Sequence, residues 1–231
     1  MSRTPILDPQ AVPVLGTDAH LPAVSASQLT EAALRQRFAA APHWETETRG
    51  DGGLFAGRTP AAASVLVPLV SRADGLHLLL TRRTDHLRDH AGQISFPGGR
   101  VEPEDADAEA TALRETEEEV GLPRAYIDVI GSLPPYHTVT AFVVTPVVAI
   151  VRPGFSLTLD TFEVAEAFEV PLSFLMDPAH HQRHEAEVAG VRRQFLSMPW
   201  DAIGADGQPR RYFIWGATAA MLRNFYRFLS A

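Results

Sequence analysis

Three glutamates near the middle of the chain share one face of a predicted helix. Glu115, Glu118 and Glu119 stand at positions i, i+3 and i+4, and a rise of ~1.5 Å per residue keeps them within ~6 Å along the helix axis. Carboxylates that close repel one another and raise each other's pKa unless a cation lies among them. Hard divalent cations that take oxygen ligands, Mg²⁺ or Mn²⁺, suit such a cluster. The alternative is a solvated acidic helix face without a metal.

The segment around these glutamates carries signals for both ends of the helix. Asp107 is a suitable N-cap, and the helical pattern continues to Val120. Gly121 suits the left-handed position after the last turn, and Pro123 prevents continuation of the helix. A second stripe at helical spacing should pack on the core: Leu113, Thr116 and Val120.

The stretch Gly98–Leu122 resembles the Nudix box, the signature of Nudix hydrolases: Gly, five residues, Glu, seven residues, Arg-Glu, apolar, any, Glu-Glu, any, Gly, apolar. From Arg114 onward every position agrees except Thr116, which stands where an apolar residue is usual. Upstream, the five-residue spacer that follows Gly99 is succeeded by Asp105, where the motif has Glu. Eight residues rather than seven then separate Asp105 from Arg114.

The segment just upstream, LLTRRTDHLRDHAGQISFPGG from Leu79 to Gly99, carries a second resemblance. It is similar to the signature of the coenzyme A pyrophosphatase branch: Leu-Leu-Thr, any, Arg, a small residue, three residues, Arg, three residues, Gly, three residues, Phe-Pro-Gly-Gly. Thr84 stands where Ser or Ala is usual, and every other specified position agrees. This branch commonly carries the extra residue seen in the box, so the two signatures support each other.

The resemblance implies metal-dependent hydrolysis of the pyrophosphate in coenzyme A, which releases 3′-phosphoadenosine 5′-phosphate and 4′-phosphopantetheine. Glu115 and Glu119 would hold Mg²⁺ or Mn²⁺, and Glu118 would be a further ligand or the base. Arg114, four residues before Glu118, could orient that carboxylate through an ion pair on the helix face. The backbone of Gly99 could donate a carbonyl to the metal, because a residue without Cβ allows a close approach.

Arginines of the upstream signature are candidates for binding the substrate, because their forked guanidinium matches phosphate oxygens. Arg83 and Arg88 occupy the specified positions and are predicted phosphate ligands; the alternative is an ion pair with the acidic helix. Arg82 should face the opposite side of its strand and be solvent-facing or structural. His86 and His90 could add donors to phosphate, or be surface histidines.

Acidic residues beyond the box often complete the metal shell or polarise the attacking water in this family. Glu163 and Glu166 are the candidates, and no motif selects between them. Solvated strand carboxylates are the alternative. Three histidines that follow, His180, His181 and His184, are expected to be exposed to solvent and not to form a metal site.

Hydrophobic periodicity places the elements that carry these residues. Strands are expected at 64–70, 76–82, 127–133, 139–151 and 212–215. Helices are expected at 27–40 with Ser27 as cap, at 107–120, from about 173 and from 216. Residues 1–24 are expected to be a mobile arm or an irregular wrap, and 136–138 a loop near the site.

The fold class implied by the resemblance is α/β: the Nudix α/β/α sandwich, a mixed sheet between helices, with N-terminal and C-terminal helical extensions. We expect an N-terminal arm and helix over residues 1–60 and a Nudix domain over 61–231 that includes the C-terminal helix. Pro68 should put part of its strand at an edge or a bulge. The aromatic stripe of the last helix could face the core or a homodimer interface.

Composition excludes several classes of function. The 231 residues hold no Cys and no Lys, which removes thiol, Cys-zinc, Schiff-base and Walker-type chemistry. A formal charge of −8 argues against nucleic acid as a partner. The chain has neither a long apolar run nor a signal-peptide pattern, so no membrane association and a cytoplasmic location are expected.

Two alternatives to coenzyme A hydrolysis stay open at this level. The first is a Nudix pyrophosphatase that acts on ADP-ribose or a nucleoside triphosphate. The second is a catalytically silent Nudix domain that only binds a nucleotide. The complete set of Arg114, Glu115, Glu118 and Glu119 favours an enzyme.

Overall fold

A mixed sheet forms the centre of the protein. The computed structural model describes residues 6, 8–51, 59–87, 91–188, 190–204 and 206–231. In this part of the chain the central sheet has eight strands: β2 Ala61–Arg72, β3 Gly75–Arg83, β4 Ile94–Ser95, β5 Gly98–Arg100, β6 Ile127–Ser132, β7 Tyr136–His137, β8 Phe142–Val151 and β9 Val164–Pro171. Strands β2 and β8 run parallel, and the other pairings are antiparallel.

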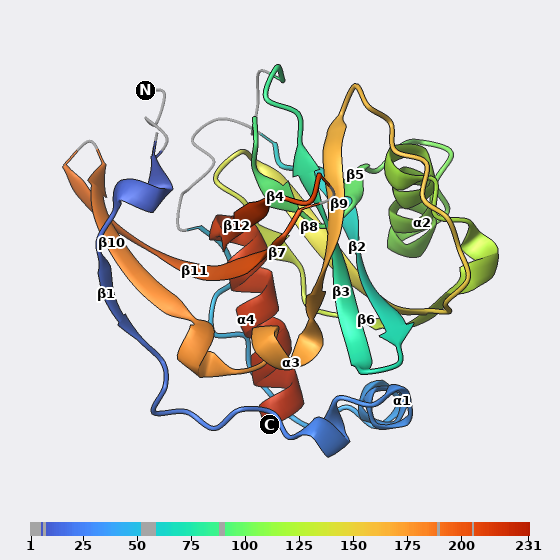
Figure 1. Ribbon diagram of the computed structural model, residues 1–231, viewed down its shortest axis with the longest axis horizontal. Coiled ribbons are helices and arrows are strands. Elements are labelled where there is room, and N and C mark those ends of the chain that lie inside the picture. Colours follow the sequence, from blue (N-terminus) through green and yellow to red (C-terminus); the bar gives the residue numbers. More distant parts are fainter. Residues whose placement is uncertain (1–5, 7, 52–58, 88–90, 189, 205) are drawn as a thin grey trace.

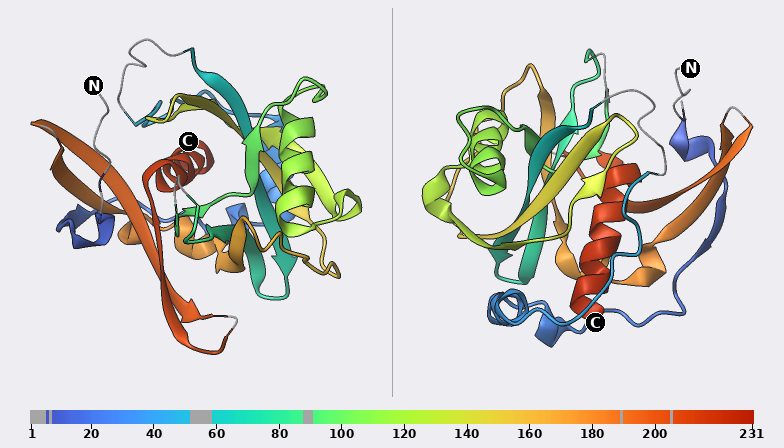
Figure 2. Two further views of the ribbon diagram at one scale, coloured as in Figure 1. Left: turned by 90° about the horizontal axis from the view of Figure 1, so that it is seen from above. Right: turned by 180° about the vertical axis from the view of Figure 1, so that it is seen from behind.

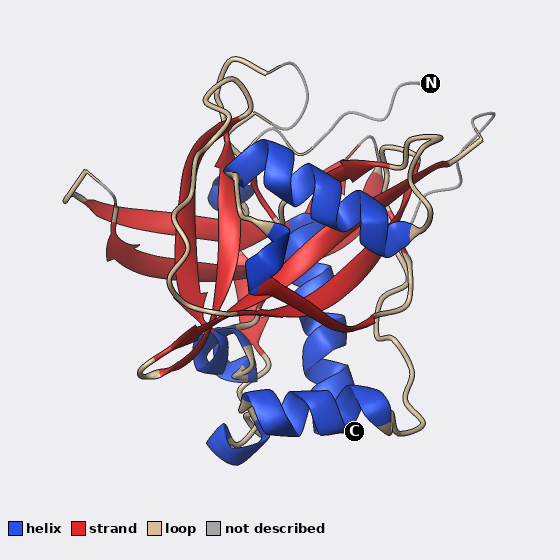
Figure 3. Cartoon of the chain, turned by 90° about the vertical axis from the view of Figure 1, so that its right-hand side faces the viewer, coloured by secondary structure: helices blue, strands red, loops and turns tan. Residues whose placement is uncertain are grey.

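Helices cover both faces of this sheet (Figure 3). Alternate residues of β8 face opposite layers: Val147 and Ala149 pack with Ala112 of α2 (Ala108–Val120), whereas Val144 and Val148 belong to the main core. That core includes residues of α1 (Glu31–Ala39) and α4 (Gly216–Ser230). The structure therefore confirms the predicted α/β/α sandwich with a mixed sheet. A single turn, α3 (Leu172–Leu175), follows β9.

The long strand β2 holds the site in register. One of its sides pairs with β8 along ten residues, while the other pairs first with β5 and then with β3. Pro68 lies in the gap between these two partners, where a missing N–H breaks no ladder bond. Pro68 therefore lies in an interior strand whose pairing is interrupted on one side, and not at the predicted edge position or bulge.

A second sheet lies beside the sandwich, and of its strands the sequence pattern predicted only the one at 212–215 (Figures 1 and 2). Its four strands follow the order β1-β10-β11-β12: Val14–Thr17, Gln182–Val188, Val191–Ile203 and Pro209–Trp215. Because β1 pairs with β10, residues 14–17 form a strand, and the prediction of a mobile arm or an irregular wrap is wrong there. The four-residue strand is too short and too exposed to show a period.

Three other local predictions need correction. The first long helix begins at Glu31 with Thr30 as N-cap, because Ala26–Gln28 instead forms a separate 3₁₀ turn. Residues 136–137 are a short strand, β7, paired with β8. His181 and His184 are buried rather than exposed, because His181 packs on Tyr226 of α4 and His184 stacks on Phe195 within the second sheet.

The C-terminal helix α4 belongs to the interior. Phe225 and Phe228 are buried and pack with Phe38 of α1, so the aromatic stripe is core. Arg37 donates to the Phe228 and Leu229 carbonyls and so satisfies the helix end. No helix in the described residues is long and apolar enough to cross a membrane.

Candidate active site on helix α2

The ends of α2 match the predicted signals. Asp107 accepts a hydrogen bond from the Ala110 N–H at 2.8 Å, as an N-cap does. Gly121 has φ 65° and ends the helix in the left-handed region. Thr116 and Val120 are buried, and the Thr116 hydroxyl donates to the Ala112 carbonyl at 2.7 Å. This internal bond allows a Thr to occupy a position that is usually apolar, because its polar atom is satisfied.

Arg114 is the centre of a network of carboxylates. Its guanidinium donates to both Asp105 oxygens, at 3.0 and 2.9 Å, and to the Arg100 carbonyl at 3.1 Å. The remaining edge reaches Glu115 at 3.2 Å and Glu118 at 3.0 Å. Hydrogen bonding with Arg114 lowers the pKa of Asp105 well below its usual range. Asp105, which departs from the usual Glu of the motif, therefore makes a bidentate pair despite its shorter side chain.

Glu119 is the most buried glutamate of the cluster, with 8% of its surface exposed. One carboxylate oxygen accepts a hydrogen bond from the Gly98 N–H at 3.2 Å. Burial raises the pKa of Glu119 to about 8, although the Gly98 bond and the charge of Arg83 act in the opposite direction. The negative charges of Glu115 and Glu163 add to the rise. A cation among these groups would favour the ionised form.

Glu115 packs directly on the turn before the helix. A Cβ added at Gly99 would lie 2.5 Å from the Glu115 carboxyl carbon, so only glycine leaves room for this carboxylate. Burial raises the pKa of Glu115, Arg114 partly offsets the rise, and the charge of Glu118 contributes to it. The backbone of β5 and the face of α2 therefore meet at a desolvated carboxylate.

The donor set fits a hard divalent cation. Within the described ranges, no three His, Cys, Asp or Glu side chains already converge as a metal site. Arg114 holds Glu115 and Glu118, and the Gly98 N–H holds Glu119. Glu118, with 59% of its side chain exposed, is the most accessible of the three glutamates. Glutamate oxygens beside a glycine without Cβ are ligands that Mg²⁺ and Mn²⁺ accept.

Arg83 extends from β3 toward the carboxylates of α2. Its guanidinium nitrogens lie 3.9 Å from Glu119 and 3.9 Å from Glu163, which is beyond hydrogen-bond distance. The Arg83 Nε is buried and has no hydrogen-bond partner in the described part of the chain. The structure thus places Arg83 and Glu163 next to the box glutamates, with donor capacity left on the arginine.

Glu166 lies in a different environment. It pairs across the sheet with Arg82, whose Nε is 3.8 Å from its carboxylate, and accepts from the Tyr212 hydroxyl at 2.8 Å. Arg210 forms a further ion pair with Glu166. The carboxylate is buried among these partners, 6% exposed, and joins β9 to the second sheet. Of the two predicted acidic candidates, only Glu163 faces Arg83. Its position therefore favours Glu163 over Glu166 as the further acidic residue of the site.

Two residues near Arg83, Thr84 and Phe162, have roles that the sequence interpretation did not identify. The buried Thr84 hydroxyl donates to the Phe162 carbonyl at 2.8 Å, and its N–H donates to the Glu163 carbonyl at 2.9 Å. Thr84 therefore holds the turn that presents Phe162, which is 65% exposed and contacts His86 edge to face. An aromatic residue inside the polar turn 160–163 is the signal that could have revealed it. Arg88 and His90 lie outside the described residues.

Comparison with known proteins agrees with this geometry. The family model of the NUDIX domain matches residues 60–202. The chain belongs to the Nudix hydrolase family. An uncharacterized Nudix hydrolase, NudL, of Escherichia coli (strain K12 / DH10B) is 43% identical over 161 residues, which are 70% of this chain and 79% of that protein. NudL of Enterobacter sp. (strain 638) is 42% identical over 162 residues, again 70% and 79% of the two chains.

Solved structures of other Nudix proteins are more distant. A Nudix hydrolase from M. smegmatis, RenU, is 21% identical with a TM-score of 0.44, covering 53% of this chain and 78% of that chain. An Ap4A hydrolase from C. elegans is 20% identical with a TM-score of 0.43, covering 51% and 85%.

Proposed function

We propose that this Nudix hydrolase cleaves the pyrophosphate of coenzyme A into 3′-phosphoadenosine 5′-phosphate and 4′-phosphopantetheine. The proposal rests on the segment Leu79–Gly99, whose residues resemble the coenzyme A signature and whose strand brings Arg83 to the carboxylates of α2. The observation that carries it is the buried Nε of Arg83, which has no hydrogen-bond partner among the described residues. A buried N–H without an acceptor is costly, so a site of this kind is complete only when an anion is bound.

The carboxylates of α2 have distinct proposed roles. Glu115 and Glu119 hold Mg²⁺ or Mn²⁺, with the Gly99 carbonyl as a further ligand, and Glu118 is a further ligand or the base. When bound, such a cation supplies charge neutralisation on the pyrophosphate and a more acidic water. Arg114 orients Glu118, which it contacts at 3.0 Å, while the Asp105 pair keeps the guanidinium in place.

Two residues outside the box complete the proposed chemistry. Glu163 lies 3.9 Å from Arg83 and is 44% exposed, so it can accept the proton of the attacking water when Glu118 serves as a metal ligand. Arg83 then donates to the phosphate that carries the leaving charge. Glu166, saturated by Tyr212 and an arginine, remains a structural carboxylate.

Phe162 gives the proposed site a planar wall. Its exposed ring stands one residue from Glu163, and Thr84 fixes its backbone. A large apolar ring kept in water beside an anion site suits a ligand that joins a phosphate to a flat heterocycle. The adenine of coenzyme A has this form.

Product analysis tests the proposed reaction. Purified protein is incubated with coenzyme A, dephospho-coenzyme A or ADP-ribose and with Mg²⁺ or Mn²⁺, and the products are separated by liquid chromatography. We expect 3′-phosphoadenosine 5′-phosphate from coenzyme A at the highest kcat/KM. Faster turnover of ADP-ribose would support the alternative substrate class, and no turnover of any of the three would support a silent binding domain.

Adjacent arginines on β3 provide a matched pair of variants. Arg83→Met removes the donors that face α2, so kcat/KM for coenzyme A should fall by roughly 100-fold, as expected for lost charged hydrogen bonds. Arg82→Met removes the same charge from the opposite face, beside Glu166. Its kcat/KM should change less than about threefold, because Arg82 faces Glu166 and not the carboxylates of α2. Equal losses in both variants would contradict the assignment of Arg83.

A further inference from the structure

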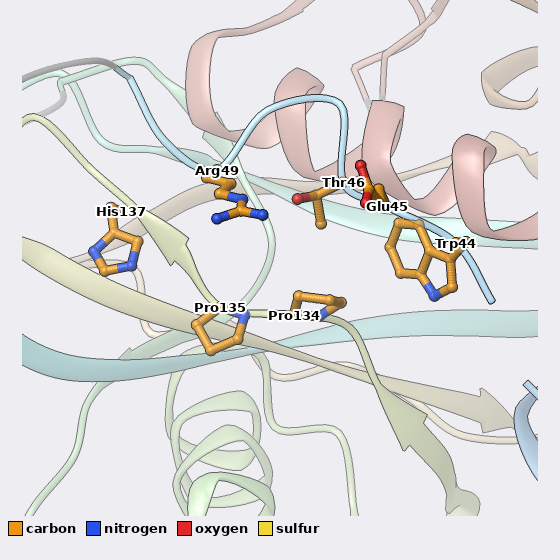
Figure 4. A pocket seen from close by; sticks show the side chains of 7 residues that line it. All are labelled: Trp44, Glu45, Thr46, Arg49, Pro134, Pro135 and His137. Carbon is orange, nitrogen blue, oxygen red and sulfur yellow. The ribbon is translucent and has the colours of Figure 1, made fainter.

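A pocket of about 280 Å³ lies outside the α2 site. The segment 44–49 forms one wall, and Pro134, Pro135 and His137 form the other (Figure 4). At this level of the sheet the strand order is β5, β2, β8, β7. Three strand spacings of ~4.8 Å place His137 about 14 Å across the sheet from Gly99. None of the α2 glutamates lines the pocket.

Arg49 is the cation of this pocket. Its guanidinium makes neither an ion pair nor a hydrogen bond with any described residue, although the chain carries a formal charge of −8. Figure 4 shows the guanidinium at the end of the pocket nearest His137 and Pro135. A free guanidinium beside an imidazole is a suitable receptor for the oxygens of a phosphate.

The backbone around Arg49 is fixed on both sides. The Asn224 amide of α4 accepts from the Thr48 N–H at 3.2 Å and donates to the Thr48 carbonyl at 2.7 Å. The His137 N–H donates to the Arg49 carbonyl at 3.0 Å, and the Asp51 N–H donates to the His137 carbonyl at 3.0 Å. Preorganised walls reduce the entropy lost on binding, so a small ligand can be held here.

The other end of the pocket is flat and largely apolar. The Trp44 indole packs on Phe228, with ring centroids 5.4 Å apart, and is partly exposed beside Pro134. Glu45 lies at the Trp44 end in Figure 4, away from Arg49. A phosphate would be repelled at this end, whereas a ring with an amino group can stack on the indole and donate to Glu45. The two ends thus fix the orientation of a ligand.

We propose that this Arg49 pocket is a second ligand site, which binds a phosphomonoester of an amino-bearing nucleoside. The phosphate lies on the Arg49 guanidinium, and the base lies on Trp44. The ligand is either a free nucleotide or the terminal phosphomonoester of a longer substrate, since both offer the same chemistry.

Tryptophan fluorescence tests the pocket without catalysis. The protein, in EDTA, is titrated with adenosine 5′-monophosphate, 3′-phosphoadenosine 5′-phosphate and inorganic phosphate. We expect saturable quenching by the nucleotides, which is lost in Trp44→Phe. Arg49→Met should weaken binding by about tenfold or more, as expected when a charged hydrogen bond is lost. Arg193→Met, which removes a distant arginine without a partner among the described residues, should bind like the wild type.

The source of the phosphate is decided by a second comparison. If the pocket takes the 3′-phosphate of the substrate, Arg49→Met abolishes the preference for coenzyme A over dephospho-coenzyme A. If it takes a free nucleotide, that preference stays as in the wild type while the quenching is weakened. The proposed ligand site would be contradicted if no saturable quenching occurred up to millimolar nucleotide, or if Arg49→Met bound the nucleotide as tightly as the wild type. The titration is valid even if coenzyme A is not the substrate.

Discussion

The carboxylates of two regions of this molecule have pKa values shifted in opposite directions. The first region is the α2 cluster of Glu115, Glu118 and Glu119; the second is the α4 ion cluster, made of Asp18, Glu47, His181, Arg183 and Arg223. Desolvation raises the pKa of Glu119 to about 8. In the α4 ion cluster desolvation acts in the same direction on Asp18 and Glu47, yet hydrogen bonds and charges from Arg183 and Arg223 lower both pKa values.

The α4 ion cluster is closed on itself. Arg223, 1% exposed, lies 2.7 Å from Glu47 and 3.2 Å from Asp18, and donates to the His181 Nδ1 at 3.1 Å. Arg183 reaches the same two acids at 2.7 and 2.8 Å. This cluster joins the N-terminal segment, the second sheet and α4, and its acids and arginines balance each other.

The α2 cluster is open by contrast. Arg114 donates to Glu115 and Glu118 and also makes a bidentate pair with Asp105. These three acids and the nearby Glu119 therefore share one close arginine. Arg83 stays 3.9 Å from Glu119. Negative charge in excess, held in a desolvated position, costs stability and is retained where a cation or substrate compensates for it. The contrast predicts that changes at α2 affect turnover, whereas changes at α4 affect folding.

The largest effect is expected at Glu119. Glu119→Gln keeps an oxygen that accepts from the Gly98 N–H but removes the charge that would hold a divalent cation. Turnover should fall by ~1000-fold or more, because cation binding contributes several kcal/mol to the transition state. The melting temperature, measured in EDTA, should not fall, since the desolvated charge has been removed. Both are measured on one preparation, by product release and by calorimetry.

Glu117→Gln is the matched control for this experiment. Glu117 lies on the same helix but pairs with Arg124 at the surface, so its loss should leave turnover within about threefold of the wild type. Undiminished turnover in Glu119→Gln would refute the metal-binding role of the α2 cluster.

Arg223→Met should have the opposite profile. The substitution leaves Asp18 and Glu47 with less compensation in a buried position, which typically costs about 3–5 kcal/mol of unfolding free energy. The melting temperature should fall by roughly 10 °C in a chain of this size. At a temperature where the variant is folded, kcat should stay within about threefold of the wild type. Arg192→Met, which removes an 81% exposed partner of Glu185, serves as control and should melt within about 1 °C of the wild type.

The elements of the sandwich could be predicted because their signals are local. Alternating and β-branched residues marked β2, β3 and β8, and an N-cap with a terminal glycine marked α2. In the second sheet only residues 212–215 carried such a signal. Its strand β10 is polar and its partner β1 has four exposed residues, so only pairing with β11 defines it. Long-range pairing of this kind leaves no periodic pattern in the sequence.

The candidate site could be predicted only in part for a similar reason. Motif spacing identified Arg114 and the glutamates because they share one helix face. The choice between Glu163, in the turn before β9, and Glu166, within β9, depends on which of them lies against Arg83, and that requires the β3–β9 register. Burial of His181 and His184 depends on partners far along the chain, which explains why their predicted exposure was wrong.

Acid should weaken the α4 ion cluster through His181. Burial lowers the pKa of His181 to about 4 from 6.5, and the positive charge of Arg223 adds to this, against the Leu175 bond and the charges of Asp18 and Asp177. A depressed histidine pKa means stability that is present above pH 6.5 and lost as pH falls toward 4. The loss is about 3 kcal/mol over this range. Urea unfolding at pH 6.5 and 4.5 measures most of it.

His181→Gln isolates the contribution of His181 to the pH dependence of stability. The variant is less stable at pH 6.5, but its unfolding free energy should change less between pH 6.5 and 4.5 than that of the wild type. His180→Gln, at a neighbouring exposed histidine, should keep the wild-type dependence. An unchanged slope in His181→Gln would show that other groups account for the acid sensitivity.

The smallest effect is expected at the exposed rim of the α2 cluster. Phe162→Ala removes a ring that is 65% exposed and whose one aromatic contact among the described residues is His86, so folding should be unaffected. If the ring stacks on the adenine, KM for coenzyme A should rise by roughly tenfold while kcat stays near the wild-type value, since base stacking is worth ~1–3 kcal/mol. Ile203→Ala, at a residue that is 66% exposed on the second sheet, should leave KM unchanged. A fall in kcat without a rise in KM would instead place Phe162 in the positioning of Glu163, because Thr84 ties both residues to β3.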